Sequence, residues 1–240
     1  KRDGATGVSE YRALGYLADA MVNFLALLGW APPGGDREIF SRDELTRLFD
    51  LDRVQKHGAV FDVVKLTWMN GEYVRSAPLD ELVRETVALL ETEPEAESLR
   101  KDRAHVAAAC ELMHERTKTL AELVRGSRYL FSSAFELPWD LEAVDKRAGT
   151  AEARSRLREA GDALAAEFVW ERGEIERVIR GLAERNGRKA AEYISPLRVA
   201  ITGLAVSAGI FETAEVLGAK ITLGRIDAFL RRFSEVAVKA

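Results

Sequence analysis

The side chains that most often bind metal ions are scarce in this sequence. It contains three histidines and one cysteine, and Cys110 and His114 stand four residues apart, which places them on one face of a helix. Two soft ligands at that spacing could begin a zinc site, but no second pair lies nearby in the sequence. The alternative is a packed thiol beside a surface imidazole. We therefore expect no metal site in this chain.

The sequence contains no motif for self-contained nucleotide binding or nucleophilic catalysis. It has neither a G-x-x-x-x-G-K-S/T loop nor a G-x-G-x-x-G turn, and no G-x-S-x-G elbow links its serines to a catalytic base. Carboxylate pairs occur on predicted helix faces, where ion pairs at a spacing of four residues are the ordinary explanation. The sequence thus favours a binding module, and we expect no catalytic residue and no cofactor in this chain.

One arginine stands where two predicted helices are separated by a short break. Arg116 lies between the helices predicted for residues 99–113 and 117–129, and such a break exposes backbone and side chain together. A guanidinium can donate paired hydrogen bonds to a base edge and can stack on the base, which an ammonium group cannot do. The alternative is an ion pair of Arg116 with Glu115 or Glu122. Arg116 is therefore a candidate for base recognition.

A second arginine precedes a run of small residues in the last third of the chain. Glycine and alanine near residue 208 bring backbone N–H and C=O groups to a surface turn at the start of a helix. Such a loop can bind one unstacked base. The alternative is that Phe211 is a core residue and that Arg198 bonds to carbonyl groups. The candidate binding residues of this loop are Arg198, Ser207, Ala208, Ile210 and Phe211.

Helical periodicity positions these residues, and no strand-like alternation exceeds four or five residues. Ser41 and Glu44 form a capping-box pattern for a helix at residues 42–49. Another helix is expected to follow Asp62 and to stop at Gly71, which can adopt the left-handed conformation. The predicted fold is all-α, an elongated array of helical subdomains. Further helices are expected at residues 18–28, 79–90, 99–113, 117–129, 140–146, 151–168, 174–185 and 222–236.

Composition limits the class of protein but names no activity. With 240 residues and 47% apolar content the chain can bury a sizeable core. The net charge of −4 means that any phosphate-binding surface must be local. The longest apolar runs fall far below the ~18 to 20 residues of a membrane span, and no leader pattern opens the chain. The single cysteine suits a reducing compartment, so we expect a cytoplasmic protein. We also expect a monomer that binds neither membrane nor DNA.

A series of short blocks in the first third of the chain resembles bacterial glutamyl-tRNA synthetase, a class I family. The blocks occur in the family's order, as Gly15-Tyr16-Leu17, residues 23–30, residues 37–40, Val60-Phe61-Asp62 and residues 65–73. The resemblance begins at the end of the adenylate-loop motif, with Lys1 as the remnant of the ATP-facing loop. It implies a catalytic domain upstream, an inactive chain on its own, and a parent enzyme that uses ATP and Mg²⁺ to attach L-glutamate to tRNA(Glu).

Both arginine segments share this resemblance. Arg116, followed by Thr119 and Leu120, falls on the arginine that reads the third anticodon base in the family. That arginine matches the cytosine ending both glutamate anticodons and disfavours the guanine ending those for glutamine. The run at residues 196–203 and the turn at 209–212 are similar to the family's pocket for the first anticodon base. The chain departs from the pattern with Ile201 for Leu, and with Ser207-Ala208 where many members carry a proline-containing turn.

The resemblance also implies a division of the chain into three parts. These are a stem-contact domain at residues 1–77, a first anticodon-binding subdomain at 78–131 and a second at 132–240. In that arrangement the chain contacts the inner elbow of tRNA(Glu) and reads its anticodon. Two alternatives remain. A helical protein-interaction module predicts an exposed apolar groove and no RNA affinity, whereas a paralogue without tRNA binding would not retain Arg116 and Arg198 together.

Overall fold

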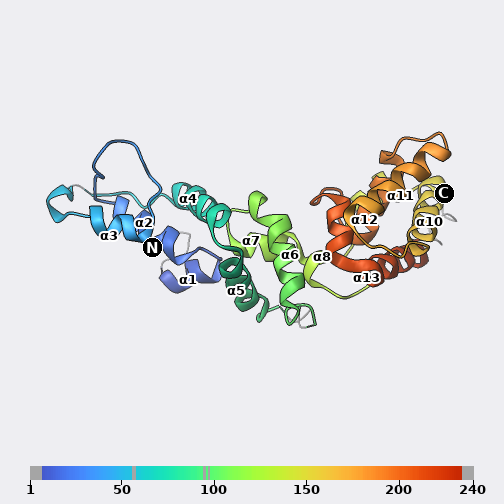
Figure 1. The fold of residues 1–240 in the computed structure, drawn as a ribbon, viewed down its shortest axis with the longest axis horizontal. Helices are drawn as coiled ribbons and strands as arrows, with labels where there is room; N and C mark the ends of the chain where they lie inside the picture. The colour runs from blue at the N-terminus through green and yellow to red at the C-terminus, as the bar shows by residue number, and fades with distance from the viewer. Residues whose placement is uncertain (1–6, 56–57, 94–95, 97, 234–240) are drawn as a thin grey trace. The chain divides into compact units, whose positions relative to one another are not determined.

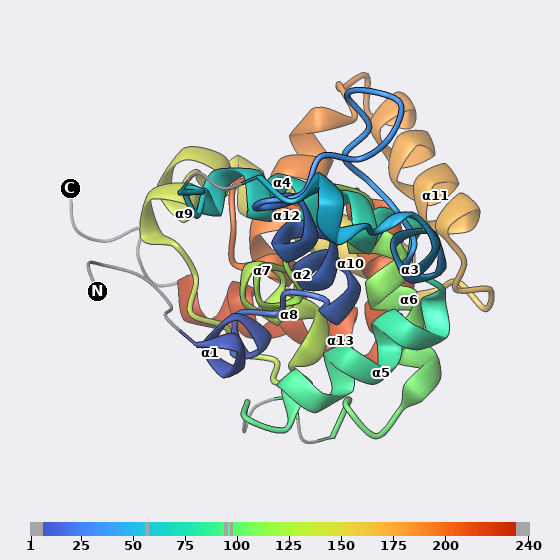
Figure 2. The ribbon, with the colours of Figure 1, turned by 90° about the vertical axis from the view of Figure 1, so that its left-hand side faces the viewer.

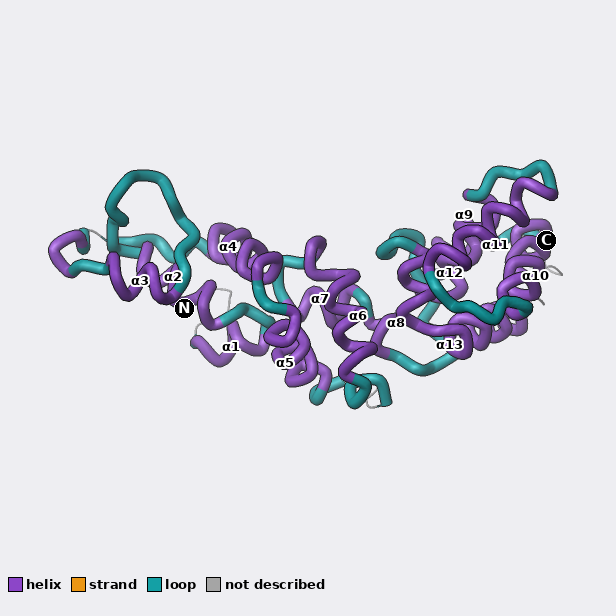
Figure 3. The backbone as a smooth tube through the Cα atoms, viewed as in Figure 1, coloured by secondary structure: helices purple, strands orange, loops and turns teal. Residues whose placement is uncertain are grey.

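The computed structural model describes residues 7–55, 58–93, 96 and 98–233. In this part of the chain all regular elements are helices (Figure 1, Figure 3). The extended pairing there is limited to an isolated antiparallel bridge between Trp30 and Val54. The all-α class predicted from periodicity is confirmed. Lys1, the expected remnant of an ATP-facing loop, lies outside the described residues.

The helices form two compact units, each with its own set of contacts. The first unit contains residues 1–92 and 113–126, and the second contains residues 93–112 and 127–240. The chain therefore leaves the first unit, returns to it for the segment that carries Arg116, and then leaves it again. The three-part division with boundaries at residues 77 and 131 stays a prediction.

The first unit is built from short helices. They are α1 (Val8–Ala13), α2 (Ala18–Leu27), α3 (Arg42–Leu48), the 3-10 turn η1 (Leu51–Arg53), α4 (Val63–Ser76), α5 (Leu79–Leu90), the 3-10 turn η3 (His114–Arg116) and α7 (Leu120–Gly126). Helix α2 packs against α3 and α4, and α5 packs against α7 (Figure 2). The apolar side chains between them form two clusters, one around Phe24, Leu66 and Met69, the other around Trp30, Phe40 and Leu45.

Side chains that cap α3 and α4 fix where these helices begin. The Ser41 hydroxyl accepts the N–H of Glu44 at 3.2 Å, and the Glu44 carboxylate accepts the N–H of Ser41 at 2.8 Å. The predicted capping box is confirmed. Asp62 Oδ1 accepts the N–H groups of Val64 at 2.8 Å and Lys65 at 3.1 Å. These bonds satisfy N–H groups that have no partner inside the helix.

The predicted helix end at Gly71 is wrong, because α4 continues to Ser76. Gly71 is buried inside the helix. A Cβ atom at this position would lie 3.4 Å from Cγ and 3.6 Å from Cα of Lys118. These are ordinary van der Waals distances, so Gly71 is an interior helix position that packs against the segment of Lys118, and it does not adopt the left-handed conformation.

A buried asparagine and a tyrosine join three segments of the first unit. Asn23 Nδ2 donates to the carbonyl of Glu38 at 3.0 Å, and Asn23 Oδ1 accepts from the N–H of Phe40 and the hydroxyl of Tyr73, each at 2.7 Å. The carbonyl oxygen of Phe40 lies 2.5 Å from the same hydroxyl, whose single proton is shared between the two acceptors. Burial raises the pKa of Tyr73 to about 12, with the charge of Asp19 as a second cause.

We expect the stability of the first unit to fall as pH rises from 10 toward about 12. The pKa of Tyr73 is higher in the folded state than the ordinary tyrosine value of 10 that applies to the unfolded chain. The contribution of Tyr73 to the free energy of unfolding is therefore complete below pH 10 and is lost as the pH rises to the folded-state pKa, because the unfolded chain loses its proton first. The decline should be shallower in Tyr73→Phe, which should also lose ~1 to 2 kcal/mol at neutral pH. Urea denaturation at a series of pH values measures both effects, and equal declines in the two proteins would contradict the assignment.

The second unit contains most of the longer helices. They are α6 (Arg103–Met113, within this unit as far as Leu112), α8 (Arg128–Phe131), α9 (Leu141–Ala148), α10 (Ala151–Ala165), α11 (Arg172–Arg185), α12 (Ala191–Thr202) and α13 (Ile210–Phe233). Helices α10 to α13 all pack against one another (Figure 1). Several predicted boundaries are wrong. The helix expected from residue 99 begins at Arg103, and the one expected to reach residue 168 ends at Ala165. The helix expected at 117–129 is divided at Ser127, and the helix expected from 222 begins at Ile210, with a break at Gly218 where φ is 76°.

Arg225 joins α13 to two other segments of the second unit. Its guanidinium is fully buried and donates to the carbonyls of Ser132, Ala134 and Ile201, at 3.0 Å for Ala134 and 2.7 Å for Ile201. Burial lowers the pKa of Arg225 to about 10, so the group stays protonated at neutral pH. These bonds hold the segment before α9 and the end of α12 to α13.

Candidate functional site

Arg116 is the last residue of η3, the 3-10 turn between α6 and α7. The predicted interruption of the helix at this position is confirmed. The Arg116 side chain is exposed, and among the described residues none forms a hydrogen bond or ion pair with its guanidinium. All of its N–H donors are therefore available to a ligand.

The two carboxylates considered as partners of Arg116 bind other groups. Glu115 Oε1 lies 3.3 Å from Nε2 of His114. Glu122 Oε2 accepts the backbone N–H of Lys118 at 2.9 Å and the N–H of Thr119 at 3.3 Å. Glu122 is thus part of the cap of α7, because its own N–H donates to the hydroxyl of Thr119 at 3.1 Å.

The turn that carries Arg116 is held at both ends. The Thr117 hydroxyl donates to the carbonyl of Met113 at 2.8 Å. At the other end, the N–H of Leu120 donates to the carbonyl of Gly15 at 3.0 Å. Gly15 has a φ of +77°, and a Cβ there would lie 2.4 Å from the backbone nitrogen of Ala121, so a larger residue could not approach this way. The turn therefore presents Arg116 from a fixed backbone.

The second candidate loop joins α12 to α13 and is organised by Arg198. Arg198 Nη1 donates to the carbonyl of Ala208 at 2.7 Å and to the hydroxyl of Ser207 at 2.5 Å. The N–H of Ala208 donates in turn to the hydroxyl of Tyr129 at 3.4 Å. The structure thus brings Arg198, Ser207 and Ala208 together. Bonding of Arg198 to carbonyl groups is the alternative to base binding that the sequence left open, and the bond to Ala208 agrees with that alternative.

The other residues of this loop divide into buried supports and one exposed tip. Ala208, Ile210 and Phe211 are buried, with 3%, 3% and 7% of their surface exposed, whereas Val206 is 82% exposed. The guanidinium carbon of Arg180 lies 5.9 Å from the centroid of the Phe211 ring. Among these candidates, Arg198 and Ser207 are only partly buried. They and the loop backbone are therefore the groups that can reach a ligand.

Two residues before α9, which were not among the predicted site residues, support the end of α12. Trp139 Nε1 donates to the carbonyl of Ala200 at 3.1 Å, and the N–H of Asp140 donates to the carbonyl of Gly203 at 2.9 Å. The loop from residue 203 to 209 is thus anchored at its start. Arg198 and its loop belong to the second unit, and Arg116 belongs to the first.

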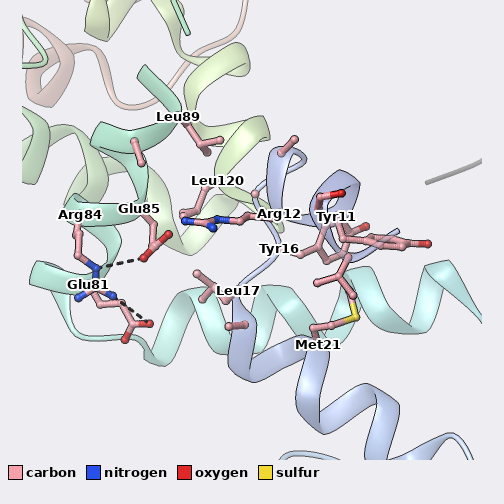
Figure 4. A pocket seen from close by; sticks show the side chains of 16 residues that line it. Tyr11, Arg12, Tyr16, Leu17, Met21, Glu81, Arg84, Glu85, Leu89 and Leu120 are labelled. Carbon is pink, nitrogen blue, oxygen red and sulfur yellow. Dashed lines mark hydrogen bonds and ion pairs between the residues drawn. The ribbon is translucent and has the colours of Figure 1, made fainter. Parts of the chain in front are cut away.

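The first unit also contains a pocket that no sequence motif indicated. Its volume is about 520 Å³, and it lies between α1, the start of α2, and α5. Figure 4 shows Arg12 reaching from α1 into this pocket toward Glu85. Arg84 pairs with Glu85 at 3.2 Å and lies 3.9 Å from Glu81. Two carboxylates thus offset the two guanidinium groups, which makes the pocket unsuited to a polyphosphate.

The described part of the chain shows neither a candidate metal site nor a candidate membrane span. No three His, Cys, Asp or Glu side chains in it are grouped so that they could hold an ion. Cys110 is buried within α6. Helices long and apolar enough to cross a bilayer are also missing from the described residues.

Comparison with protein families assigns both halves of the chain. Residues 79–230 match the family described as "Anticodon binding domain", and residues 1–68 match the family described as "tRNA synthetases class I (E and Q), catalytic domain". The chain is 39% identical over 233 residues to glutamate–tRNA ligase 2 of Caldicellulosiruptor saccharolyticus and 41% identical over 231 residues to glutamate–tRNA ligase of Thermodesulfovibrio yellowstonii. These alignments cover 97% and 94% of the chain, but 47% and 48% of the relatives. The chain thus spans about half the length of these relatives.

A solved structure has the same fold. The glutamate tRNA ligase from Elizabethkingia meningosepticum, solved in complex with its amino acid, superimposes with a TM-score of 0.80 at 26% sequence identity. The match covers 95% of this chain and 43% of that protein. The glutamate–tRNA synthetase of Elizabethkingia anophelis, at 24% identity and a TM-score of 0.73, supports the fold alone.

Proposed function

The chain belongs to the glutamyl-tRNA synthetase family, and we propose that it binds tRNA(Glu) and reads the anticodon for a glutamate–tRNA ligase. The match of residues 79–230 to an anticodon-binding family supports this. We propose further that the whole protein attaches L-glutamate to this tRNA with ATP and Mg²⁺, in the cytoplasm and as a monomer. The relatives that carry the ligase name, each about twice as long as this chain, support that activity.

The single observation that carries the proposal is the exposed and unpaired guanidinium of Arg116. An exposed guanidinium is hydrated in the absence of RNA, so leaving it without a protein partner has little energetic cost. When a base binds, the same N–H groups can donate hydrogen bonds to the base edge. Its turn is fixed by the bond between the Thr117 hydroxyl and the carbonyl of Met113 on one side, and by the Gly15 contact and the capped helix α7 on the other. The base therefore meets a donor that is already in place, which limits the entropy lost on binding.

The loop between α12 and α13 supplies the second proposed contact. We assign the base contact to the Ser207 hydroxyl, the partly buried Arg198 and the nearby backbone. Ala208, Ile210 and Phe211 support the loop from below, because their side chains are buried. Arg198 thus has a double role in this proposal, since it holds the loop through Ala208 and contributes positive charge beside the base.

We propose that ATP and Mg²⁺ serve the whole protein and are not held by the described residues. The offsetting charges in the pocket of the first unit support this, because they do not favour a polyphosphate. Nothing in the recognition step needs the nucleotide. Anticodon reading in this proposal depends only on hydrogen bonds and charge supplied by the chain itself.

Titration with a fluorescent anticodon stem-loop tests the proposal. If about three to four phosphates are neutralised, raising salt from ~50 to ~200 mM should weaken binding roughly 20- to 100-fold, because bound counterions are released. A hairpin with the same stem and a scrambled loop is the control and should bind more weakly at both salt concentrations. Fluorescence anisotropy gives the dissociation constants. Absence of binding even at the lower salt concentration would contradict the proposal.

A helical protein-interaction module is the second candidate, and one observation favours it. Leu51, Val60 and Val64 in the first unit are each at least 77% exposed, and a partner protein that covered these apolar side chains would remove them from water. This candidate predicts no affinity for the stem-loop at any salt concentration. The same titration therefore decides between the two.

A further inference from the structure

Asn70 bonds two segments of the first unit that are far apart in sequence. From its place on α4, its Oδ1 accepts the N–H of Leu17 at 2.8 Å, and its Nδ2 donates to the carbonyl of Lys118 at 2.6 Å. The side chain is fully buried. A side-chain amide offers an acceptor and a donor in one plane, so it can form both bonds at once.

The bond to Lys118 fixes the turn that carries Arg116, which is two residues earlier. Helix α4 packs against η3, and Gly71 on α4 lies beside Lys118. The backbone carbonyl of Lys118 faces the Asn70 amide, while its N–H faces Glu122. Both sides of this peptide segment are therefore held by buried or capped groups.

We propose that Asn70 is a positioning residue for base recognition, which sets the place of Arg116 through the carbonyl of Lys118. The inference rests on the proposed function, because it assumes that Arg116 reads a base. Asn70 itself is buried beneath the turn and does not touch the RNA. Recognition by a paired hydrogen bond tolerates errors of only about 0.5 Å in the placement of the donor. Release of the turn from α4 should therefore reduce base discrimination more than overall affinity.

Asn70→Asp tests this role because it removes one bond and keeps the other. An ionised carboxylate still accepts the N–H of Leu17, but it cannot donate to Lys118 and repels that carbonyl. Asn23→Asp is the matched control. Asn23 is also fully buried in the first unit, and its Nδ2 also donates to a carbonyl, that of Glu38, away from the Arg116 turn. Each variant therefore loses one hydrogen bond from a side-chain amide to a backbone carbonyl, and both side chains are fully buried.

The measurement uses the whole 240-residue chain at pH ~8, well above the ordinary pKa of an aspartate. Because burial raises the pKa of a carboxyl group, the uncharged pair Asn70→Ser and Asn23→Ser is measured alongside. Two anticodon stem-loops that differ only in the third anticodon base, cytosine or guanine, are titrated against wild type and both variants. We expect Asn70→Asp to lower the ratio of the two affinities at least about threefold and Asn23→Asp to leave it unchanged. The urea midpoints of the variants show whether their losses of stability are similar.

Each outcome decides a separate claim. A wild-type ratio near one overturns the proposed function of Arg116 and this inference with it. A wild-type ratio well above one that Asn70→Asp retains overturns this inference alone. An equal fall of the ratio in both variants also overturns it, since any loss of packing would then be sufficient. If either Asp variant is unfolded, the pair Asn70→Ser and Asn23→Ser, which introduces no charge, decides by the same criteria.

Discussion

Replacing Arg225 by methionine should destabilise the second unit by on the order of 3 to 5 kcal/mol. Methionine fills most of the volume, but the carbonyls of Ser132, Ala134 and Ile201 lose their donors in a buried environment. Each buried acceptor left without a partner costs ~1 to 3 kcal/mol. The effect is large because one side chain serves three acceptors on two segments.

Hydrogen exchange of peptides from α12 and α13, with urea denaturation of the whole chain, measures this loss. Arg232→Met on the same helix is the matched control, because Arg232 is exposed and its loss should change stability by less than ~0.5 kcal/mol. Arg225→Lys keeps the charge but cannot direct a planar fork at three carbonyls, so most of the loss should remain. If Arg225→Met and Arg232→Met are equally stable, the three bonds do not hold α13 in place.

Local signals predicted the parts of the fold that depend on a few neighbouring residues. The capping box of Ser41 and Glu44 was predictable because both partners lie within four residues of each other. The break before Arg116 was predictable for the same reason, since the pattern of apolar residues is interrupted there. Gly71 was misjudged because a glycine can also stand inside a helix, and the residue beside it there, Lys118, is far away in the sequence.

Arg225 was overlooked because an arginine in a helix is normally an exposed residue. A usable signal was present. Thr222 and Phe229, three residues before and four residues after Arg225, share its face of α13, and both are buried. A charged residue in phase with an apolar face requires buried acceptors, but the sequence does not show which carbonyls provide them.

The candidate site was predictable to the level of residue choice and no further. The resemblance indicated Arg116 and the loop at residues 207–211, whereas the structure shows that three of the five loop candidates are buried supports. Burial of Phe211 depends on its packing within the second unit. The bond between Asn70 of α4 and the carbonyl of Lys118, two residues after Arg116, joins segments 48 residues apart and carries no local sequence signal.

Replacing Arg116 by glutamine should abolish most of the preference for cytosine over guanine at the third anticodon base. A well-placed contact to a base edge contributes ~1 to 3 kcal/mol of discrimination, roughly ten- to hundred-fold in the ratio of affinities. The fold should be unaffected, because Arg116 is exposed and no described residue pairs with it. Arg116→Lys should lose much of the preference as well, because lysine retains the charge without the planar fork.

Lys118→Gln separates base reading from general attraction to phosphate. Lys118 is exposed on the same turn, so this variant removes the same charge from nearly the same place. It should weaken binding of the cytosine and guanine stem-loops by the same factor, whereas Arg116→Gln should weaken the cytosine stem-loop selectively. Anisotropy titrations of wild type and both variants at moderate salt give the ratios. If wild type binds the two stem-loops equally, or if Lys118→Gln changes the ratio as much as Arg116→Gln does, Arg116 is not the residue that reads this base.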